Sequence, residues 1–270
     1  MPNDYKAIGL LEDEAIDLDT SALALAAPDH PQVALDPYID HLRDLTRRLV
    51  KAGRGASSAS EQGEAIAAVL AGDLGYRGDR AAYEHPDNAD LIRVIDRRRG
   101  LPVSLSILYV AAARRLGWTA EVLNTPGHVL VRLGPETDPL LIDPFNGGAV
   151  VSAEDLASLL RRILGTAARP SAEHLKPMEN RAVLIRLLLN QASRAEASAN
   201  VSGALTLYER MTAIAPDYSQ PWWDRARLET ATGDVQAARS SLSAMLEITR
   251  DVHVRNHVFA ALDALSGTRT

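Results

Sequence analysis

The first part of the chain repeats its apolar residues at helical spacing. Residues 36–53 carry Leu or Ile at positions 39, 42, 45 and 49, which is the pattern of a helix with one buried face. Residues 60–75 and 88–100 predict two further helices. The second of these has Asn88 as a candidate N-cap and Gly100 as its end. A helical N-terminal lobe is therefore expected.

The most apolar helical pattern lies in the middle of the chain, in residues 102–116. Pro102 suits the first turn of a helix, because the N–H that proline lacks is not used there. Apolar residues at 105, 108, 112 and 116 form one stripe, and Arg114 and Arg115 complement the negative end of the helix. Gly117 ends the pattern. We expect a buried central helix here.

After this helix the apolar residues change to a period of two. Residues 118–124, 128–134 and 140–145 predict three short strands, separated by the turn-forming stretches TPG and PETDP. Residues 152–165 begin with a capping serine followed by acidic residues and predict another helix. The combination predicts an α+β domain in which the central helix accompanies a small antiparallel sheet.

The C-terminal third is helical throughout and contains an internal repeat. Ala, Tyr, Met, Ile and Asp at positions 204, 208, 211, 214 and 217 recur 34 residues later as Ala, Leu, Met, Ile and Asp. A period of 34 is typical of tetratricopeptide (TPR) helix pairs. Trp222 stands near the start of the next unit, where that pattern has a large aromatic residue, and is a candidate binding residue. The alternative is an ordinary four-helix tail with chance periodicity.

These patterns divide the chain into three parts. We expect an N-terminal segment of uncertain role at residues 1–35, the α+β domain at 36–165, and an all-α, TPR-like domain at 178–270. Residues 166–177 are the best candidate for a linker between the two domains.

Composition narrows the classes of function. The net charge of −6 disfavours a nucleic-acid-binding role, which usually shows clustered positive charge. The absence of cysteine excludes disulfides, thiolate zinc sites and a cysteine nucleophile. The sequence shows neither a signal-peptide pattern nor an apolar run of roughly 18 residues. We therefore expect a cytoplasmic protein without a membrane partner, and we expect no metal or other cofactor.

Three residues near the central helix could form a catalytic group. His128 follows a Pro-Gly turn and Asp143 ends the next strand, so Asp143 could hold one ring nitrogen of His128 while the other faces the start of the helix. Ser104 is the nearest hydroxyl at that helix start, where free N–H groups stabilise anions. Each residue alone has an ordinary structural explanation, since Asp-Pro, for example, is common in turns. Together they predict a nucleophile, a base and an orienting carboxylate.

The same region resembles a known family. The stretch from Leu74 to Gly134, LGYRGDRAAYEHPDNADLIRVIDRRRGLPVSLSILYVAAARRLGWTAEVLNTPGHVLVRLG, followed by LIDPFNGG, resembles the bacterial SirB-type branch of the transglutaminase-like superfamily. The resemblance covers roughly residues 37–165, and that branch also carries a helical tail. It implies a papain-like fold in which a Cys at the start of the central helix attacks an acyl group. His128 and Asp143 match the family's assisting His and Asp.

The family's Cys has no counterpart in this chain. In active members it stands two residues after the Gly that precedes the helix, a position that corresponds to Pro102 here. Proline offers neither a nucleophile nor an N–H for an oxyanion hole. Ser104 lies about 200° around the helix axis from that position and does not inherit the Cys geometry. Its more ordinary role is to bond the backbone at the helix start, and Ser106 is a poorer substitute.

A basic run, Arg97–Arg99, precedes the central helix. These three residues could bind an anionic group or an acidic partner peptide, and Arg99 is the candidate nearest the helix start. The ordinary explanation is a solvated basic turn that pairs with Asp90 and Asp96.

Two functional hypotheses follow from the missing nucleophile. The first is a non-catalytic protein that binds a protein or peptide partner, with Pro102, His128 and Asp143 in a vestigial or binding groove. The alternative is an acyl-transfer enzyme of the amidase, peptidase or transglutaminase type that uses Ser104 with His128 and Asp143. A structural module with an unused cleft is a third possibility. The first two differ in geometry, because catalysis requires the Ser104 oxygen within hydrogen-bond reach of a His128 ring nitrogen.

Overall fold

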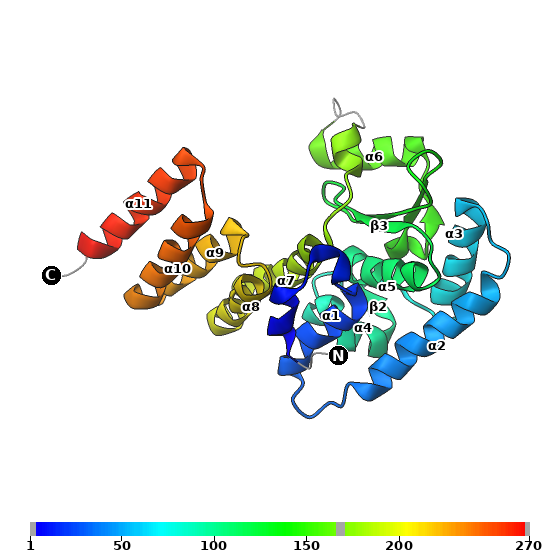
Figure 1. Cartoon of the computed structure of the whole chain (residues 1–270), viewed down its shortest axis with the longest axis horizontal. Coiled ribbons are helices and arrows are strands. Elements are labelled where there is room, and N and C mark those ends of the chain that lie inside the picture. The colour runs from blue at the N-terminus through cyan, green and yellow to red at the C-terminus, as the bar shows by residue number, and fades with distance from the viewer. Residues whose placement is uncertain (1–3, 166–170, 268–270) are drawn as a thin grey trace. The chain divides into compact units, whose positions relative to one another are not determined.

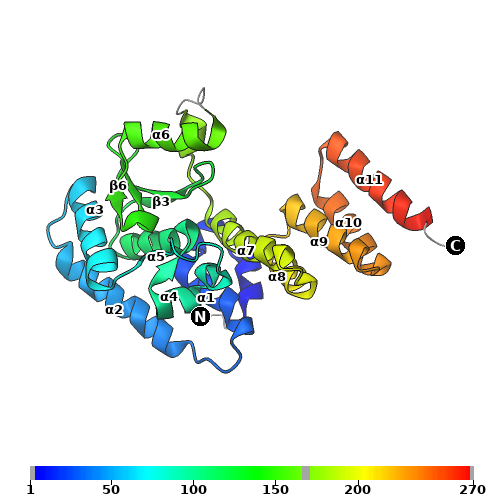
Figure 2. The same cartoon turned by 180° about the vertical axis from the view of Figure 1, so that it is seen from behind.

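The computed structural model describes residues 4–165 and 171–267 and divides into two compact units. One unit comprises residues 12–187, and the other comprises residues 1–11 with 188–270. Figure 1 colours the chain from its N-terminus to its C-terminus, and Figure 2 shows it from behind. Among the helices of the described residues, none is both long and apolar enough to cross a membrane.

The unit of residues 12–187 has a helical lobe built around a central helix. This helix, α5 (Pro102–Arg115), has every residue from Pro102 to Ala113 buried. The lobe also contains α1 (Leu18–Ala26), α2 (Asp36–Ala52), α3 (Ala59–Ala67) and α4 (Leu91–Arg97). A π-helical turn at Ala68–Asp73 extends α3. In α2 the buried residues are Leu42, Leu45 and Leu49, so the apolar stripe in the sequence does face the core.

A small antiparallel sheet packs beside the central helix. Its strands, in spatial order, are β3 (Ala120–Leu123), β4 (Leu130–Leu133), β5 (Leu140–Asp143) and β6 (Ala149–Val150). Helix α6 (Ala153–Leu164) lies on the opposite side of this sheet from α5, as both views show (Figures 1 and 2). Its residues Leu156 and Leu160 pack against the sheet residues Leu123 and Leu130. The α+β fold with a small antiparallel sheet is therefore confirmed.

Two short strands join the segments that lead into α5. β1 (Arg77–Gly78) pairs in parallel with β2 (Arg99–Gly100). Gly78 has no room for a side chain, because an added Cβ would stand 2.5 Å from the ring atoms of Phe145. This close approach fixes the β1 segment against the turn that follows β5.

Several boundaries differ from those that the sequence suggested. Helix α4 is capped by Asp90, whose side chain accepts a hydrogen bond from the Arg93 N–H, and not by Asn88. It ends at Arg98, which adopts a left-handed conformation with φ of 56°, and not at Gly100. Residues 12–35 belong to the unit of the α+β domain, because α1 is buried along almost its whole length.

The second unit is helical. It contains η1 (Tyr5–Leu10), α8 (Val201–Ile214), α9 (Ser219–Ala231), α10 (Val235–Ile248) and α11 (Val252–Gly267). The division between the units falls within α7 (Asn180–Ala197). Helices α8 and α10 start 34 residues apart and are capped by Asn200 and Asp234, which are also 34 residues apart. The repeat is thus visible in the helices, while its assignment to the TPR family stays a prediction. Residues 166–170 of the expected linker lie outside the described residues.

Candidate functional site

The structure brings His128 and Asp143 together. His128 Nε2 lies 2.9 Å from Asp143 Oδ2. Asp143 ends β5 and caps the following turn, where its Oδ1 accepts hydrogen bonds from the main-chain N–H groups of Phe145 and Asn146 at 2.9 and 3.3 Å. The Asn146 side chain adds a third donor, 2.5 Å from Oδ2. A carboxylate bonded by so many donors is held in one orientation, so it can orient the imidazole.

His128 itself lies in a turn and not on a strand. Its main-chain N–H donates to Thr125 O, and β4 begins two residues later. The ring packs edge-on against Phe145. Because the Asp143 carboxylate accepts from Nε2, the neutral ring carries its proton there and presents Nδ1 as an acceptor. Nδ1 has no hydrogen-bond partner among the described residues.

The start of α5 contains Pro102 and Ser104, both buried. Ser104 Oγ lies 2.8 Å from Asn88 O and 3.1 Å from Leu101 O, and it accepts a hydrogen bond from the Leu101 N–H at 2.9 Å. A hydroxyl has one proton to donate. That proton is used on main-chain carbonyls, and the structure forms no hydrogen bond between Ser104 and His128. The two ends of the expected triad are therefore not joined.

The face of α5 that carries Pro102 continues with Ser106 and Tyr109. At 100° per residue these two side chains lie about 40° and 20° around the axis from Pro102, on opposite sides. Both hydroxyls are buried and lack a hydrogen-bond partner among the described residues. Burial and the nearby Asp143 carboxylate raise the pKa of the Tyr109 hydroxyl. The charge of Asp143 therefore acts on the face of α5 that carries Pro102 and Tyr109, and Ser104 lies on a different face.

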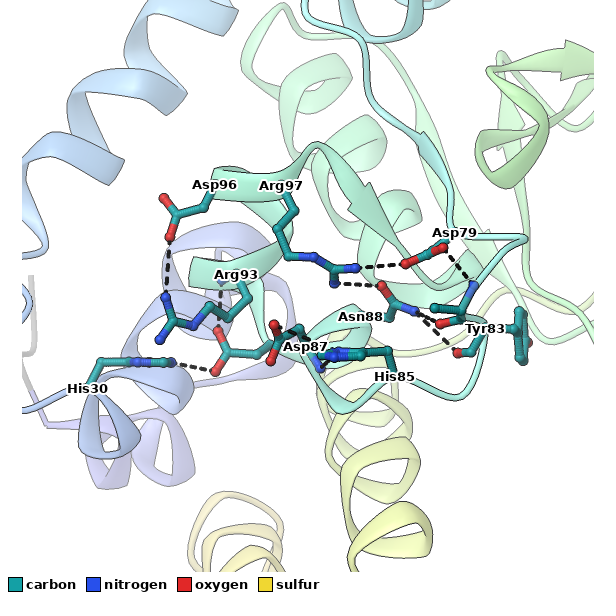
Figure 3. Close-up of polar contacts among 11 residues, drawn as sticks. His30, Asp79, Tyr83, His85, Asp87, Asn88, Arg93, Asp96 and Arg97 are labelled. Carbon is teal, nitrogen blue, oxygen red and sulfur yellow. Dashed lines mark hydrogen bonds and ion pairs between the residues drawn. The ribbon is translucent and has the colours of Figure 1, made fainter.

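Asn88, which the sequence suggests only as a helix cap, bonds to several segments through its main chain and its side chain. Its main-chain oxygen accepts from both Ser104 Oγ and the Leu101 N–H, while its side-chain amide donates to Ala82 O at 2.7 Å. Arg97 donates to Asn88 Oδ1 at 2.9 Å and to Asp79 Oδ2 at 2.7 Å (Figure 3). Asn88 is fully buried. The asparagine thus ties the loop before α4 to the start of α5.

The basic run before α5 is engaged within the protein. Arg97 binds Asn88 and Asp79, and the guanidinium of Arg98 contacts His41 Nε2 at 2.7 Å and the Tyr76 hydroxyl. The binding candidate Arg99 donates to two main-chain carbonyl oxygens, those of Gly75 and Arg98. The acidic partners suggested by the sequence, Asp90 and Asp96, pair instead with other side chains, those of His30 and Arg93.

Trp222 lies in the other unit, at the start of α9. Its Nε1 donates to Pro216 O at 2.8 Å, and its ring packs against the buried cluster of α9, α10 and α11. The indole thus closes the turn between α8 and α9. Its contacts are those of a residue that joins successive helices.

A cleft opens beside His128 and Asp143, between the strand ends and α6. Its volume is about 580 Å³. We call it the dyad cleft. It is lined by His128, Leu130, Asp143, Asn146, Ala149, Val150, Val151, Asp155, Ser158, Leu159 and Arg162. Pro102 and Ser104 do not line it. Within residues 4–165 and 171–267, no group of three or more acidic or histidine side chains has the arrangement of a metal site.

Comparison with known proteins gives the chain relatives along most of its length. A family model described as the transglutaminase-like superfamily matches residues 36–189. A UPF0162 protein of Xylella fastidiosa is 30% identical over 261 residues, which are 94% of this chain and 93% of that protein. A UPF0162 protein of Pseudomonas aeruginosa is 29% identical over 231 residues, covering 86% of this chain and 84% of the relative. F-box only protein 21 of Mus musculus is 32% identical over 174 residues, which are 61% of this chain and 27% of that protein.

Proposed function

Because the chain belongs to the transglutaminase-like superfamily yet carries Pro102 where active members have their nucleophile, we propose that it is a non-catalytic member that binds a peptide segment of a partner protein. The peptide occupies the dyad cleft, beside His128 and Asp143. The observation that carries this proposal is the bonding of Ser104, whose hydroxyl is turned to Asn88 O while the cleft stays open.

The geometry at the helix start argues against acyl transfer. A serine nucleophile must pass its proton to a base with which it is aligned. Ser104 Oγ instead directs its single proton to the main-chain oxygens of Asn88 and Leu101, both within hydrogen-bond distance, and accepts a hydrogen bond from the Leu101 N–H. Releasing it would leave buried polar groups unpaired, at a cost of about 1 to 3 kcal/mol each. Proline at 102 also withholds the N–H that an oxyanion hole would use.

The cleft has the size and lining of a peptide site. A volume of about 580 Å³ falls in the range of sites that bind small ligands or a few residues. Its wall combines apolar side chains, such as Leu130 and Leu159, with the polar pair of His128 and Asp143. A mixed lining of this kind is typical of sites that take apolar side chains and orient the chain that carries them.

The test is a selection of displayed random peptides on the full-length protein, followed by binding measurements on two variants. Val150 lines the cleft and is 61% exposed, so Val150→Glu adds a charge there without disturbing the core. Val50 on α2 is similarly exposed at 55% and lies outside the cleft, so Val50→Glu is the matched control. We expect selected peptides to bind Val150→Glu at least about tenfold more weakly and Val50→Glu unchanged. Equal binding to both variants contradicts the proposal.

A second arm addresses catalysis directly. Amide and ester substrates are incubated with the wild-type chain and with His128→Ala. The proposal expects the same background hydrolysis from both, because the Ser104 hydroxyl is bonded to Asn88 O and not to the His128 ring. A rate that depends on His128 and is also lost in Ser104→Ala would establish the acyl-transfer alternative.

A further inference from the structure

Arg162 on α6 is a cation in the dyad cleft that has no ion-pair or hydrogen-bond partner among the described residues. Its neighbour Arg161 differs, because it donates to Ser158 Oγ at 3.2 Å and does not line the cleft. The two arginines stand next to each other on one helix and therefore form a natural pair of test and control positions.

The two carboxylates that line the cleft are already bonded. Asp143 accepts from His128, from the Asn146 side chain and from two main-chain N–H groups. Asp155 accepts from the N–H and hydroxyl of Ser152, at 3.0 and 2.6 Å, in the capping box of α6. These hydrogen bonds lower the pKa of the Asp155 carboxyl. Both carboxylates keep their negative charge, but their oxygens already accept hydrogen bonds within the protein. Among the charged side chains that line the cleft, Arg162 is therefore the one whose N–H groups have no partner among the described residues, and a guanidinium of this kind pairs with a carboxylate.

A further polar group in the cleft lining, besides Asn146 and Ser158, is His128 with a ring nitrogen that has no partner within the described part of the chain. His128 Nδ1 carries a lone pair while Nε2–H is held by Asp143, so Nδ1 accepts an N–H from a ligand. The lining also contains the apolar side chains of Leu130, Val151 and Leu159. The cleft thus matches a ligand that has an N–H group, apolar side chains and a carboxylate, which are the parts of a peptide that ends in apolar residues.

The edge strand beside the cleft favours the end of a chain over its middle. The hydrogen bond from Val151 N–H to Leu141 O makes these two residues a hydrogen-bonded pair, so the pair Ile142–Val150 is a non-bonded one. The N–H and C=O of Val150 therefore point away from β5. Only this one residue offers a free edge before α6 begins at Ala153. A bound peptide can therefore pair with this edge over a single residue only. The terminal residues of a peptide suit so short a pairing better than the middle of a long strand does.

We infer that the dyad cleft captures the free C-terminal carboxylate of a peptide with apolar final residues, and that Arg162 is the carboxylate ligand. This inference rests on the proposed function, since it names the part of the partner that enters the cleft. His128 Nδ1 receives a main-chain N–H of the peptide, and the apolar wall receives the last side chains.

The experiment is a titration of the isotope-labelled full-length chain followed by nuclear magnetic resonance. The probe is acetyl-Ala-Val-Leu-Val with a free C-terminus, compared with the same peptide as its C-terminal amide. We expect the free acid to shift cleft resonances at concentrations up to ~1 mM and to bind about tenfold more tightly than the amide. Arg162→Gln should abolish the difference between acid and amide. Arg161→Gln, the matched control, should keep it.

Any one of the following outcomes overturns the inference. One is equal binding of acid and amide, and another is an equal loss in Arg161→Gln. The third is the absence of shifts at the cleft with either probe. An amidated peptide that carries an internal aspartate distinguishes a C-terminal carboxylate from a side-chain carboxylate. If that peptide binds as tightly as the free acid, the inference is also overturned. Peptides selected by display without a free C-terminus that still depend on Val150 leave the proposed function standing and remove only this inference.

Discussion

The two halves of the expected catalytic group differ in what their polar atoms bond to. At the start of α5, Ser104 and the main chain of Leu101 bond to Asn88, which is in turn held by Arg97. At the strand ends, Asp143 is equally well bonded, but His128 keeps one ring nitrogen without a partner among the described residues. The polar groups at the helix start bond to one another, whereas His128 and Asp143 at the strand ends line a cleft.

This difference separates groups that stabilise the fold from groups that are left to bind something. A buried polar network contributes to stability when every member is paired, and breaking one member is costly. An acceptor and a cation that line a cleft contribute little to folding and can serve a ligand. Substitutions at the helix start should therefore change stability, and substitutions of Arg162 or Val150 should change binding.

The largest expected effect is that of Asn88→Ala. The change leaves the Arg97 guanidinium with Asp79 alone and removes the donor of Ala82 O. Since the fully buried side chain of Asn88 makes all of these hydrogen bonds and its removal leaves a gap, we expect a loss of about 3 kcal/mol in the free energy of unfolding. Urea unfolding and hydrogen exchange of the α5 amides measure it. A loss below about 1 kcal/mol would contradict the view that this asparagine closes the helix start.

The next effect in size is that of Asp143→Asn, which tests the pair at the strand ends. The amide removes the charge that accepts from His128 and from the turn N–H groups, so we expect a loss of about 2 kcal/mol in unfolding free energy. Nitrogen NMR of the His128 ring should show the Nε2–H tautomer in the wild type and a mixture in the variant. Asp138→Asn, in an exposed loop, is the control and should change neither. An unchanged tautomer in Asp143→Asn would break the assignment of Asp143 as the orienting group.

Local pattern predicted the helices of this fold well and the bonding of the site only in part. The helix expected at residues 36–53 is observed as α2 at Asp36–Ala52, and the helix expected at 152–165 is observed as α6 at Ala153–Leu164. These helices carry their apolar stripes and their start signals within their own sequence, so no distant contact is needed to place them. The pairing of His128 with Asp143 was also predictable, because the resemblance and the strand order put them at adjacent strand ends.

The role of Asn88 and the dyad cleft were not predictable in the same way. Asn88 precedes a helix, and an asparagine there is ordinarily a cap. Its side chain instead bonds to Arg97 and to Ala82 O, and Arg97 in turn pairs with Asp79 beside β1, so the network joins segments that are separate in the sequence. The cleft exists because α6 packs on the sheet, so that Arg162 and His128 line the same space, and no local pattern encodes this packing of separate segments.

Two serines on α5 give a smaller but sharper contrast. Ser104 and Ser106 are both fully buried, yet Ser104 has three hydrogen-bonding neighbours and Ser106 Oγ has none among the described residues. Ser104→Ala should therefore cost about 1 to 2 kcal/mol, while Ser106→Ala should be neutral or stabilising by up to about 1 kcal/mol. Paired urea unfolding curves decide this. If both variants lose stability equally, the hydroxyl of Ser104 has no special part in the helix start.

The smallest expected effect is on stability in acid, and it comes from His41, which contacts Arg98. Burial and the Arg98 guanidinium lower the pKa of His41 to about 4 from 6.5. The unfolded chain therefore takes up a proton near pH 6.5, before the folded chain does, and the folded state loses stability as the pH falls from about 6.5 to about 4. His41→Gln keeps an acceptor for Arg98 but does not titrate. We expect it to remove on the order of 1 kcal/mol of that loss, because His41 is only half-buried and solvent screens its charge.

The measurement is urea unfolding of wild type and His41→Gln at pH 7 and pH 4.5, with the exposed His253→Gln as control. Only the difference between the two pH values is informative, because the buried Asp19 titrates in the same range with the opposite sign. Burial raises the Asp19 pKa to about 6, so that group favours the folded state as the pH falls. The Asp19 contribution is common to all three proteins and cancels in the comparison. An acid loss in His41→Gln as large as that of the wild type would show that His41 is not the source of the pH dependence.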